Sequence, residues 1–463
     1  MQPVFVSPPR LDYVRPMMQF RSPVPKNLGA MMFQRALLFL ALVLCPIMAS
    51  ADPAMPTTAD AIYAAARPKL MQIQTLLGTD GQKHSTGSSF LVSADGLAIT
   101  NYHVVSEYAL EPSTYRLEYV AIDGKRGPVQ IVAIDLADDL ALIRIDRTDQ
   151  PFFQFDGRAV AGTLPKGERL YAMGDPLDLG SSIVDGTYNG LVDRSYADRY
   201  HFTGAINSGM SGGPAVSGEG RVAGINVAKQ LNGELVGFLV PARFAAALLA
   251  QSGEGKPPAV KDLKAEIGRQ LTARQSGFYR AIEEAGFRPA VTGPYRTLEN
   301  AAPWFTCWAQ TNTDQIPKPH TIADLTSCFS DSRLFIADGL NPGLIQLSHE
   351  WLRTSELNPF QFSYLLSQQA RGGMTEKWPR KWLTRQSCRD DFVAGTGERP
   401  VQHVVWCARA YRDFDDLYDV SVTLTTEDRD KEALVSRLVL DGVSFGNAMI
   451  LSQHFVEGVG WSS

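Results

Sequence analysis

The chain of 463 residues is long enough for two or three domains, each with its own buried core. Hydrophobic residues make up 44% of it and charged residues 20%, ordinary globular values that exclude wholesale disorder and a polytopic membrane protein. The formal net charge of −5, with no basic stripe, argues against a protein that binds nucleic acid.

The first 51 residues have the pattern of an export signal. Arg35 precedes an apolar run over 36–44, and small residues follow up to Ala51, as in a secretory signal peptide. The run is short for a bilayer, so a permanent membrane anchor is the less favoured reading. We expect a leader over 1–51, with the signal peptide over 31–51, and a mature protein that is periplasmic or secreted without a stable membrane span.

Between residues 68 and 245 the sequence consists of short apolar and β-branched runs separated by Gly, Asp and Pro. Short strands at close spacing with turn signals predict an all-β barrel or sandwich. A closing helix is expected over 242–249. The expected strands cover 70–76, 88–92, 97–101, 129–134, 140–145, 169–173, 222–227 and 235–240.

The composition changes at residues 251–258, which are polar and rich in Gly and Pro, so we predict a linker there between a domain at 52–250 and a second domain at 259–463. In the second domain, apolar residues at helical spacing predict a helix that ends before Gly286. Runs at 404–411, 419–425 and 433–440 resemble strands of an antiparallel sheet. We therefore expect an accessory α+β domain.

Outside the leader the chain has four cysteines, an even number that predicts two disulfides in an oxidising compartment. Pairing Cys307 with Cys328 and Cys388 with Cys407 is the simplest of three connectivities, between which the sequence does not decide. A zinc site is the alternative, but there is no Cys-x-x-Cys pair, and His403 is the one histidine close in sequence to a cysteine. We expect no metal.

The strongest chemical feature is the stretch AINSGMSGGP at 205–214. A serine in a glycine-flanked loop can be held exposed while backbone N–H groups turn toward a point beside its hydroxyl. We expect Ser211 to be a nucleophile. The N–H groups of Gly209 and Ser211 are the expected oxyanion hole, because glycine easily adopts the positive φ that turns the first amide inward.

A serine nucleophile needs a base, and the base needs a carboxylate that orients it. His103, at the end of an apolar strand, is the candidate base. Asp139 is the candidate carboxylate because it directly precedes a strongly apolar run, whereas the adjacent Asp138 is expected to be a solvated turn residue.

Four motifs together carry a family resemblance: GSSF at 87–90, TNYHVV at 100–105, DLAL at 139–142 and GMSGGP at 209–214. They resemble the trypsin-like serine proteases of the bacterial Deg/HtrA branch. That family folds as two antiparallel β-barrels with the active site between them. The resemblance implies that His103 and Asp139 belong to the first barrel and Ser211 to the second. The family's usual PDZ domain is not recognisable in the second half.

The resemblance implies an exported serine endopeptidase that acts on proteins or peptides through an acyl-enzyme and needs no cofactor. Members often form trimers, so a homo-oligomer is compatible with it. Six residues before Ser211, where members that cut after Arg or Lys carry an acidic residue, this chain has Ala205. With Ile206 and Asn226, Ala205 is expected to form a pocket for a small or medium aliphatic P1 residue, the residue before the cleaved bond.

Met210 departs from the family pattern, which has Asp or Asn before the nucleophile. Because a methionine side chain accepts hydrogen bonds poorly, the loop around Gly209 is expected to be less firmly held. The alternative function is therefore a catalytically latent module that binds protein partners.

Overall fold

The computed structural model describes residues 58–175, 180–229, 236–253, 260–370, 374 and 379–462. The expected leader at 1–51, with its signal peptide at 31–51, lies outside the described residues, and so does most of the expected linker at 251–258. In this described part of the chain, no helix combines the length and the apolar character needed to cross a membrane.

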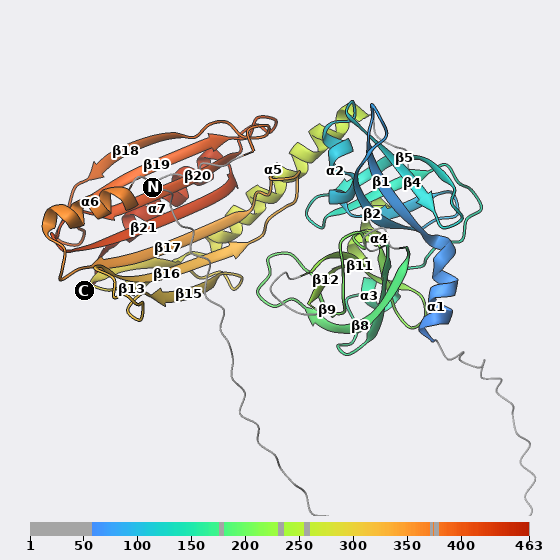
Figure 1. Cartoon of the computed structure of the whole chain (residues 1–463), viewed down its shortest axis with the longest axis horizontal. Coiled ribbons are helices and arrows are strands. Elements are labelled where there is room, and N and C mark those ends of the chain that lie inside the picture. Colours follow the sequence, from blue (N-terminus) through green and yellow to red (C-terminus); the bar gives the residue numbers. More distant parts are fainter. Residues whose placement is uncertain are drawn as a thin grey trace, which may run out of the picture. The chain divides into compact units, whose positions relative to one another are not determined.

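Six antiparallel strands close the first barrel, in the order β1-β2-β3-β6-β5-β4. Figure 1 shows β1, β2, β4 and β5 of this barrel, with α2 beside them. Helix α2 lies between β3 and β4 in the chain, and α1 with a short 3₁₀ helix precedes β1. The bounds are α1 Ala59–Ala66, η1 Arg67–Lys69, β1 Leu70–Leu77, β2 Lys83–Leu91, β3 Leu97–Thr100, α2 Tyr102–Leu110, β4 Tyr115–Ala121, β5 Arg126–Asp135 and β6 Leu140–Ile145.

Six further antiparallel strands close the second barrel, in the order β10-β11-β12-β9-β8-β7, and helix α4 follows it. The expected all-β double barrel is therefore confirmed. The bounds are α3 Gly157–Val160, β7 Arg169–Gly174, β8 Ser182–Leu191, β9 Tyr200–Thr203, β10 Pro214–Val216, β11 Val222–Lys229, β12 Gly237–Pro241 and α4 Ala242–Gln251.

Strand β6 is buried on both faces, which explains its uninterrupted apolar sequence. Leu140 and Leu142 belong to a hydrophobic cluster that includes the core of the second barrel. Ala141 and Ile143 point the other way, into a cluster with residues of α2. The segment that follows Asp139 is thus anchored from two sides.

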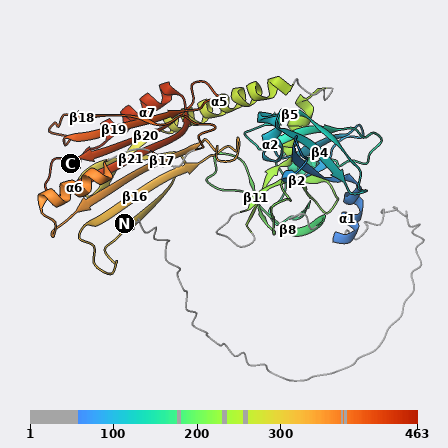
Figure 2. The ribbon, with the colours of Figure 1, turned by 45° about the horizontal axis from the view of Figure 1, so that its top comes forward.

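The C-terminal region, residues 260–462, is α+β, as expected. It contains a three-stranded sheet, β13-β14-β22, and a seven-stranded antiparallel sheet, β15-β16-β17-β21-β20-β19-β18. Figure 2 shows strands β16 to β21 of the larger sheet. The bounds are α5 Val260–Ala285, β13 Phe287–Thr292, β14 Tyr295–Asn300, β15 Thr306–Thr311, β16 Ile322–Asp331, β17 Leu344–Arg353, α6 Pro359–Gln369, β18 Ser387–Val393, β19 Gln402–Ala410, β20 Tyr418–Thr426, β21 Glu432–Val443, α7 Phe445–Gly458 and β22 Gly460–Trp461.

Helix α5 ends at Ala285, where Gly286 adopts a φ of 75°, as the glycine signal predicts. The helix takes part in two hydrophobic clusters. Leu263 and Ile267 belong to the cluster that contains residues of the first barrel, whereas Phe278 lies with α7 against the seven-stranded sheet. The C-terminal region therefore shares a hydrophobic cluster with the first barrel.

Two disulfides fasten the two edge strands of the seven-stranded sheet. Cys307 on β15 is bonded to Cys328 on β16, and Cys388 on β18 to Cys407 on β19. In each pair the cysteines lie directly opposite each other in the register, with Cα atoms 4.0 Å apart. Both edge strands are mostly exposed and bury little apolar surface of their own.

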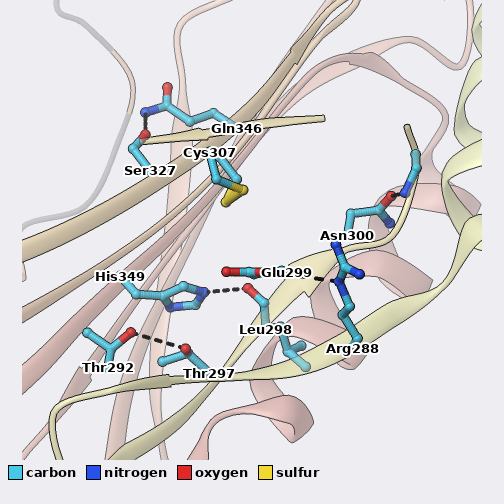
Figure 3. Close-up of a disulfide and its surroundings, with 12 residues drawn as sticks. Arg288, Thr292, Thr297, Leu298, Glu299, Asn300, Cys307, Ser327, Gln346 and His349 are labelled. Atoms are coloured by element: carbon cyan, nitrogen blue, oxygen red, sulfur yellow. Dashed lines mark hydrogen bonds and ion pairs between the residues drawn. A yellow bond between two sulfur atoms is a disulfide. The ribbon is translucent and has the colours of Figure 1, made fainter. Parts of the chain in front are cut away.

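The first of these disulfides lies close to the side chain of Glu299 (Figure 3). A carboxylate oxygen of Glu299 and the sulfurs of Cys307 and Cys328 lie within 4.8 Å of one another. The two sulfurs are bonded to each other, however, and thiolates are what a zinc ion binds. We therefore treat this group as a structural crosslink.

Replacing Cys307 and Cys328 together with serine is expected to lower the free energy of unfolding of the C-terminal region by about 3 kcal/mol, because the crosslink closes a loop of 21 residues. Denaturant unfolding followed by circular dichroism measures the change. Ser327→Ala, beside Cys328, leaves the disulfide intact and is the control, with an expected loss of less than about 1 kcal/mol. An unchanged unfolding midpoint in the double variant would contradict the stabilising role.

Candidate active site

The loop that carries Ser211 is packed tightly against the backbones of both barrels. A Cβ atom on Gly212 would lie 2.3 Å from the Ser88 carbonyl oxygen and 2.4 Å from Thr100 Oγ1, and one on Gly213 would lie 2.0 Å from the Met173 carbonyl oxygen. Gly212 also has a φ of 83°, which side chains rarely tolerate. These glycines allow the second barrel to bring Ser211 against the end of β3 in the first.

Ser88 on β2 holds the same loop through two hydrogen bonds and the segment after β7 through a third. Its hydroxyl donates to the Gly209 carbonyl oxygen at 2.6 Å and accepts from the Asp175 N–H at 2.9 Å. Its backbone N–H donates to the Ser211 carbonyl oxygen at 2.7 Å. Ser88 belongs to the GSSF motif at 87–90, but the motif indicates no separate role for its side chain. The available signal was a pair of serines, Ser88 and Ser89, that are both buried within a strand.

Asn226 supplies a second brace, from β11. Its side-chain amide donates to the carbonyl oxygens of Met173 and Met210, at 2.9 and 3.2 Å. The side chain of Met210 is fully buried in the core between the strands of the second barrel. The loop is therefore held by Ser88 and Asn226, without a polar side chain at position 210.

The residues expected to form a P1 pocket lie in different surroundings. Ala205 is exposed, Ile206 is 3% exposed and packs in the core of the second barrel, and Asn226 is fully buried with its amide on the loop carbonyls. The shared pocket stays a prediction.

The expected oxyanion donors lie on this loop. Gly209 has a φ of 92°, the positive value anticipated from its position. Among the hydrogen bonds of the described residues, none has the N–H of Gly209 or of Ser211 as its donor. The two groups are therefore available to an added acceptor, and their role stays a prediction.

His103 and Asp139 are joined at two points. The His103 Nδ1 atom and the Asp139 Oδ2 atom are 2.6 Å apart, and the His103 backbone N–H donates to the Asp139 Oδ1 atom at 2.9 Å. His103 is the second residue of α2, since β3 ends at Thr100. The carboxylate thus fixes both the imidazole ring and the start of the helix that carries it.

The backbone of Asp139 reinforces this arrangement. Its carbonyl oxygen accepts from the Tyr102 N–H at 3.1 Å and from the Asn101 side-chain amide at 2.8 Å. Asp139 has a φ of 55°, a left-handed conformation that costs a residue other than glycine roughly 1–2 kcal/mol. Such strain in a residue that orients another side chain is typical of functional sites.

The environment of His103 favours its protonated form. Burial acts against a charged imidazole, but the charge of Asp139 and its hydrogen bond act in favour and raise the pKa of His103 above its ordinary value. The ring is still 27% exposed, so the site is open to a ligand.

Asp138 is not the solvated turn residue that we expected. It is 8% exposed, and its carboxylate accepts from Arg199 of the second barrel at 2.9 Å. Burial raises the pKa of Asp138 to about 6, although Arg199 acts against the shift. The expectation was wrong because Arg199, from a segment distant in sequence, covers the Asp138 carboxylate.

The hydroxyl of Ser211 points toward the edge of β11. It donates to the Val227 carbonyl oxygen at 3.3 Å, and among the described residues no hydrogen bond joins it to His103. Strand β10 pairs with β11 only as far as Ile225, and the Ser211 loop bonds to Asn226. Within the described ranges, no strand pairs with β11 beyond Asn226 on the side that faces Ser211, so its backbone there is an edge to which another strand can be added.

Comparison with known proteins agrees with this geometry. Residues 87–225 match the family model described as trypsin-like peptidase domain. A probable periplasmic serine endoprotease, DegP-like, of Chlamydia pneumoniae is 31% identical over 173 residues, which are 36% of this chain and 34% of that protein. The serine protease HTRA1 of Xenopus tropicalis is 32% identical over 176 residues, 36% of each chain.

Two further proteins are also similar to parts of this chain. The putative serine protease HhoB of Synechocystis is 30% identical over 175 residues, 36% of this chain and 40% of that protein. A serine endoprotease from Yersinia pestis of known structure aligns with a TM-score of 0.37 and 23% identity, over 42% of this chain and 67% of that chain.

Residues 87–225 are therefore a trypsin-like peptidase domain, and its relatives are of the Deg/HtrA type. The chain spans between 34% and 40% of the length of the three curated relatives named here.

Asp139→Asn is expected to lower the pKa of His103, because burial then acts without the opposing carboxylate charge. NMR titration of the imidazole protons measures this pKa, with His103→Gln identifying the signal among the seven histidines. Asp138→Asn is the matched control, since the carboxylate of Asp138 pairs with Arg199 rather than with His103. An equal pKa in Asp139→Asn and the unmodified protein would refute the pairing.

Proposed function

We propose that this protein is a serine endopeptidase in which Ser211, His103 and Asp139 form the catalytic triad. The observation that carries the proposal is the two-point attachment of His103 to Asp139 in the first barrel. The close approach of Gly212, on the Ser211 loop of the second barrel, to Thr100, three residues before His103, supports the assignment of Ser211 as the nucleophile.

The chemistry follows from these positions. The Ser211 oxygen attacks the carbonyl carbon of a peptide bond, and its proton passes to Nε2 of His103. Asp139 holds the other ring nitrogen protonated and stabilises the imidazolium that forms. The N–H groups of Gly209 and Ser211 donate to the oxyanion. His103 then protonates the leaving amine, and water releases the acyl group from Ser211.

Export and the division of the chain belong to the same proposal. The signal-like sequence over 31–51 supports export, and the matching Chlamydia pneumoniae protein is named a probable periplasmic endoprotease. The two disulfides of the C-terminal region agree with an oxidising compartment. We assign catalysis to residues 52–250 and an accessory role to 259–463, and we take proteins or peptides as substrates. Assembly into a homo-oligomer stays a prediction.

A latent, partner-binding module is the second candidate. The observation that favours it is the Ser211 hydroxyl, which donates to the Val227 carbonyl oxygen rather than to His103. Hydrogen bonds in ligand-free sites often form fully only when a substrate binds, so this geometry is also compatible with an active enzyme.

The mature chain, residues 52–463, is expected to react with a fluorophosphonate probe and to hydrolyse casein. Ser211→Ala should abolish labelling and reduce hydrolysis by about 10⁴-fold or more, because the nucleophile is lost. Ser208→Ala, on the same loop and exposed, is the control and should keep both activities. Unmodified protein that neither labels nor cleaves would favour the latent module.

Peptides that differ only at P1 test the predicted specificity. Val, Ala or Leu at P1 is expected to give a kcat/KM about 100-fold higher than Arg or Glu, because the uncharged pocket residues Ala205, Ile206 and Asn226 offer no partner to a buried charge of either sign. Ala205→Asp should improve cleavage after Arg and Lys relative to the unmodified chain. Equal cleavage after Arg and Val by the unmodified protein would rule out an aliphatic pocket.

A further inference from the structure

The hairpin that joins β16 to β17, residues 332–343, is an ordered element with its own hydrogen bonds. The Leu334 N–H donates to the Pro342 carbonyl oxygen at 2.8 Å, and the Ile336 N–H donates to that of Leu340 at 3.1 Å. Ser332 closes the base of the hairpin with its N–H and hydroxyl on the Gly343 carbonyl oxygen. Its shape is therefore set within the C-terminal region.

This 332–343 hairpin packs against the helix that carries His103. Leu334, Ile336 and Leu340 are each less than 5% exposed and belong to the same hydrophobic cluster as Tyr102 of α2. The Tyr102 hydroxyl donates to the Ile336 carbonyl oxygen at 3.1 Å. The hairpin is thus attached to the peptidase domain at the residue next to His103.

Phe335 occupies a different position from its buried neighbours. Its ring meets the His103 ring edge to face, with centroids 5.8 Å apart, and it is only partly buried. Leu334 and Phe335 also line a cavity of about 210 Å³ together with Asp139 and Val227. One wall of a cavity beside the proposed triad therefore comes from the C-terminal region.

The lining of this cavity favours an apolar occupant. Phe238 and Val227 contribute apolar surface from the second barrel, and Leu334 and Phe335 contribute it from the hairpin. Three charged residues also line the cavity: Asp139 holds His103, Arg199 is paired with Asp138, and Arg333 has an interaction of its own within the protein. A charged substrate side chain would lose its hydration here and would have to compete for a residue that is already engaged.

A substrate strand on the free edge of β11 reaches this cavity. Successive side chains of an extended strand point to opposite sides. If the P1 side chain enters beside Ala205, the preceding side chain, P2, turns the other way. The Val227 carbonyl oxygen accepts a hydrogen bond from Ser211, and Val227 also lines the cavity. The cavity is therefore within reach of a substrate side chain one or two residues from the cleaved bond.

We propose that Phe335 determines specificity at P2: with Leu334 it forms an apolar wall, supplied by the C-terminal region, that selects aliphatic P2 side chains. This inference rests on the proposed endopeptidase function and adds to it a substrate preference and a task for the region beyond the barrels. Phe335 touches the substrate in this proposal, and its contact with His103 is the reason that the wall lies so close to the reacting atoms.

Peptides with one favourable P1 residue and a varied P2 residue test the proposal on the mature chain, residues 52–463. The unmodified protein is expected to prefer Val or Leu at P2 to Asp or Glu. Phe335→Ala removes the wall and should raise kcat/KM for Phe and Trp at P2 by about 10-fold or more relative to Val. Phe335→Leu keeps an apolar wall and should give an intermediate profile.

Phe360→Ala, the same substitution at an 88% exposed position on α6, is the matched control and should leave the P2 profile unchanged. The thermal midpoint and the pH profile of each variant are measured in parallel. If Phe335→Ala lowers kcat equally for every P2 residue and moves the pH profile, Phe335 only positions His103, and the specificity proposal is wrong.

Two further outcomes separate this inference from the proposed function. If the unmodified chain cleaves the peptides and Phe335→Ala keeps the same P2 profile, only the inference is overturned. If the unmodified chain cleaves none of them, the endopeptidase function is wrong and the inference fails with it.

Discussion

The hydrogen bonds between Asp139 and the start of α2 are the constraint on which the rest of the site depends. One carboxylate oxygen faces the His103 ring and the other accepts the His103 backbone N–H. A single side chain thereby sets the position of the helix and the orientation of the ring that it presents. The left-handed backbone of Asp139 is tolerated because β6, which begins at the next residue, is buried on both faces and cannot shift.

The second half of the site depends on close backbone contact between the barrels. Gly212 and Gly213 leave no room for side chains, and Ser88 connects the first barrel to the loop of the second with hydrogen bonds. The two barrels therefore meet directly at the Ser211 loop. The 332–343 hairpin adds a third contributor, which contacts α2 from outside both barrels.

The sequence predicted the features that depend on local chemistry. The buried run after Asp139, the glycines around Ser211 and the stop at Gly286 each have a direct physical cause that is visible in a few residues. Among the barrel strands, β4, β8, β9 and β10 were not predicted. Strand β8, for example, is mostly half-exposed, and its sequence shows neither alternation nor a continuous apolar run. Helix α2 was also missed, since its nine residues are buried mainly by tertiary contacts.

Long-range contacts account for the remaining differences. Nothing near Asp138 in sequence indicates that Arg199 covers it, and nothing near Phe335 indicates His103. The substrate pocket expected from Ala205, Ile206 and Asn226 stays a prediction, and the structure adds that the Asn226 side chain holds two carbonyl oxygens beside the loop. Asp138 and Arg199 are 61 positions apart and His103 and Phe335 are 232 apart, so these two contacts can be assigned only when the fold is known.

The two disulfide-bonded edge strands of the seven-stranded sheet, β15 and β18, affect how the sequence of this region can evolve. Exposed edge strands invite pairing with other chains, and charged residues on them discourage it. Strand β18 carries Arg389, Asp390 and Asp391, which add almost nothing to a hydrophobic core. Because a covalent bond rather than apolar packing retains β15 and β18, selection against aggregation can act freely on their surface residues. We expect these two edge strands to tolerate more sequence divergence than any strand between them.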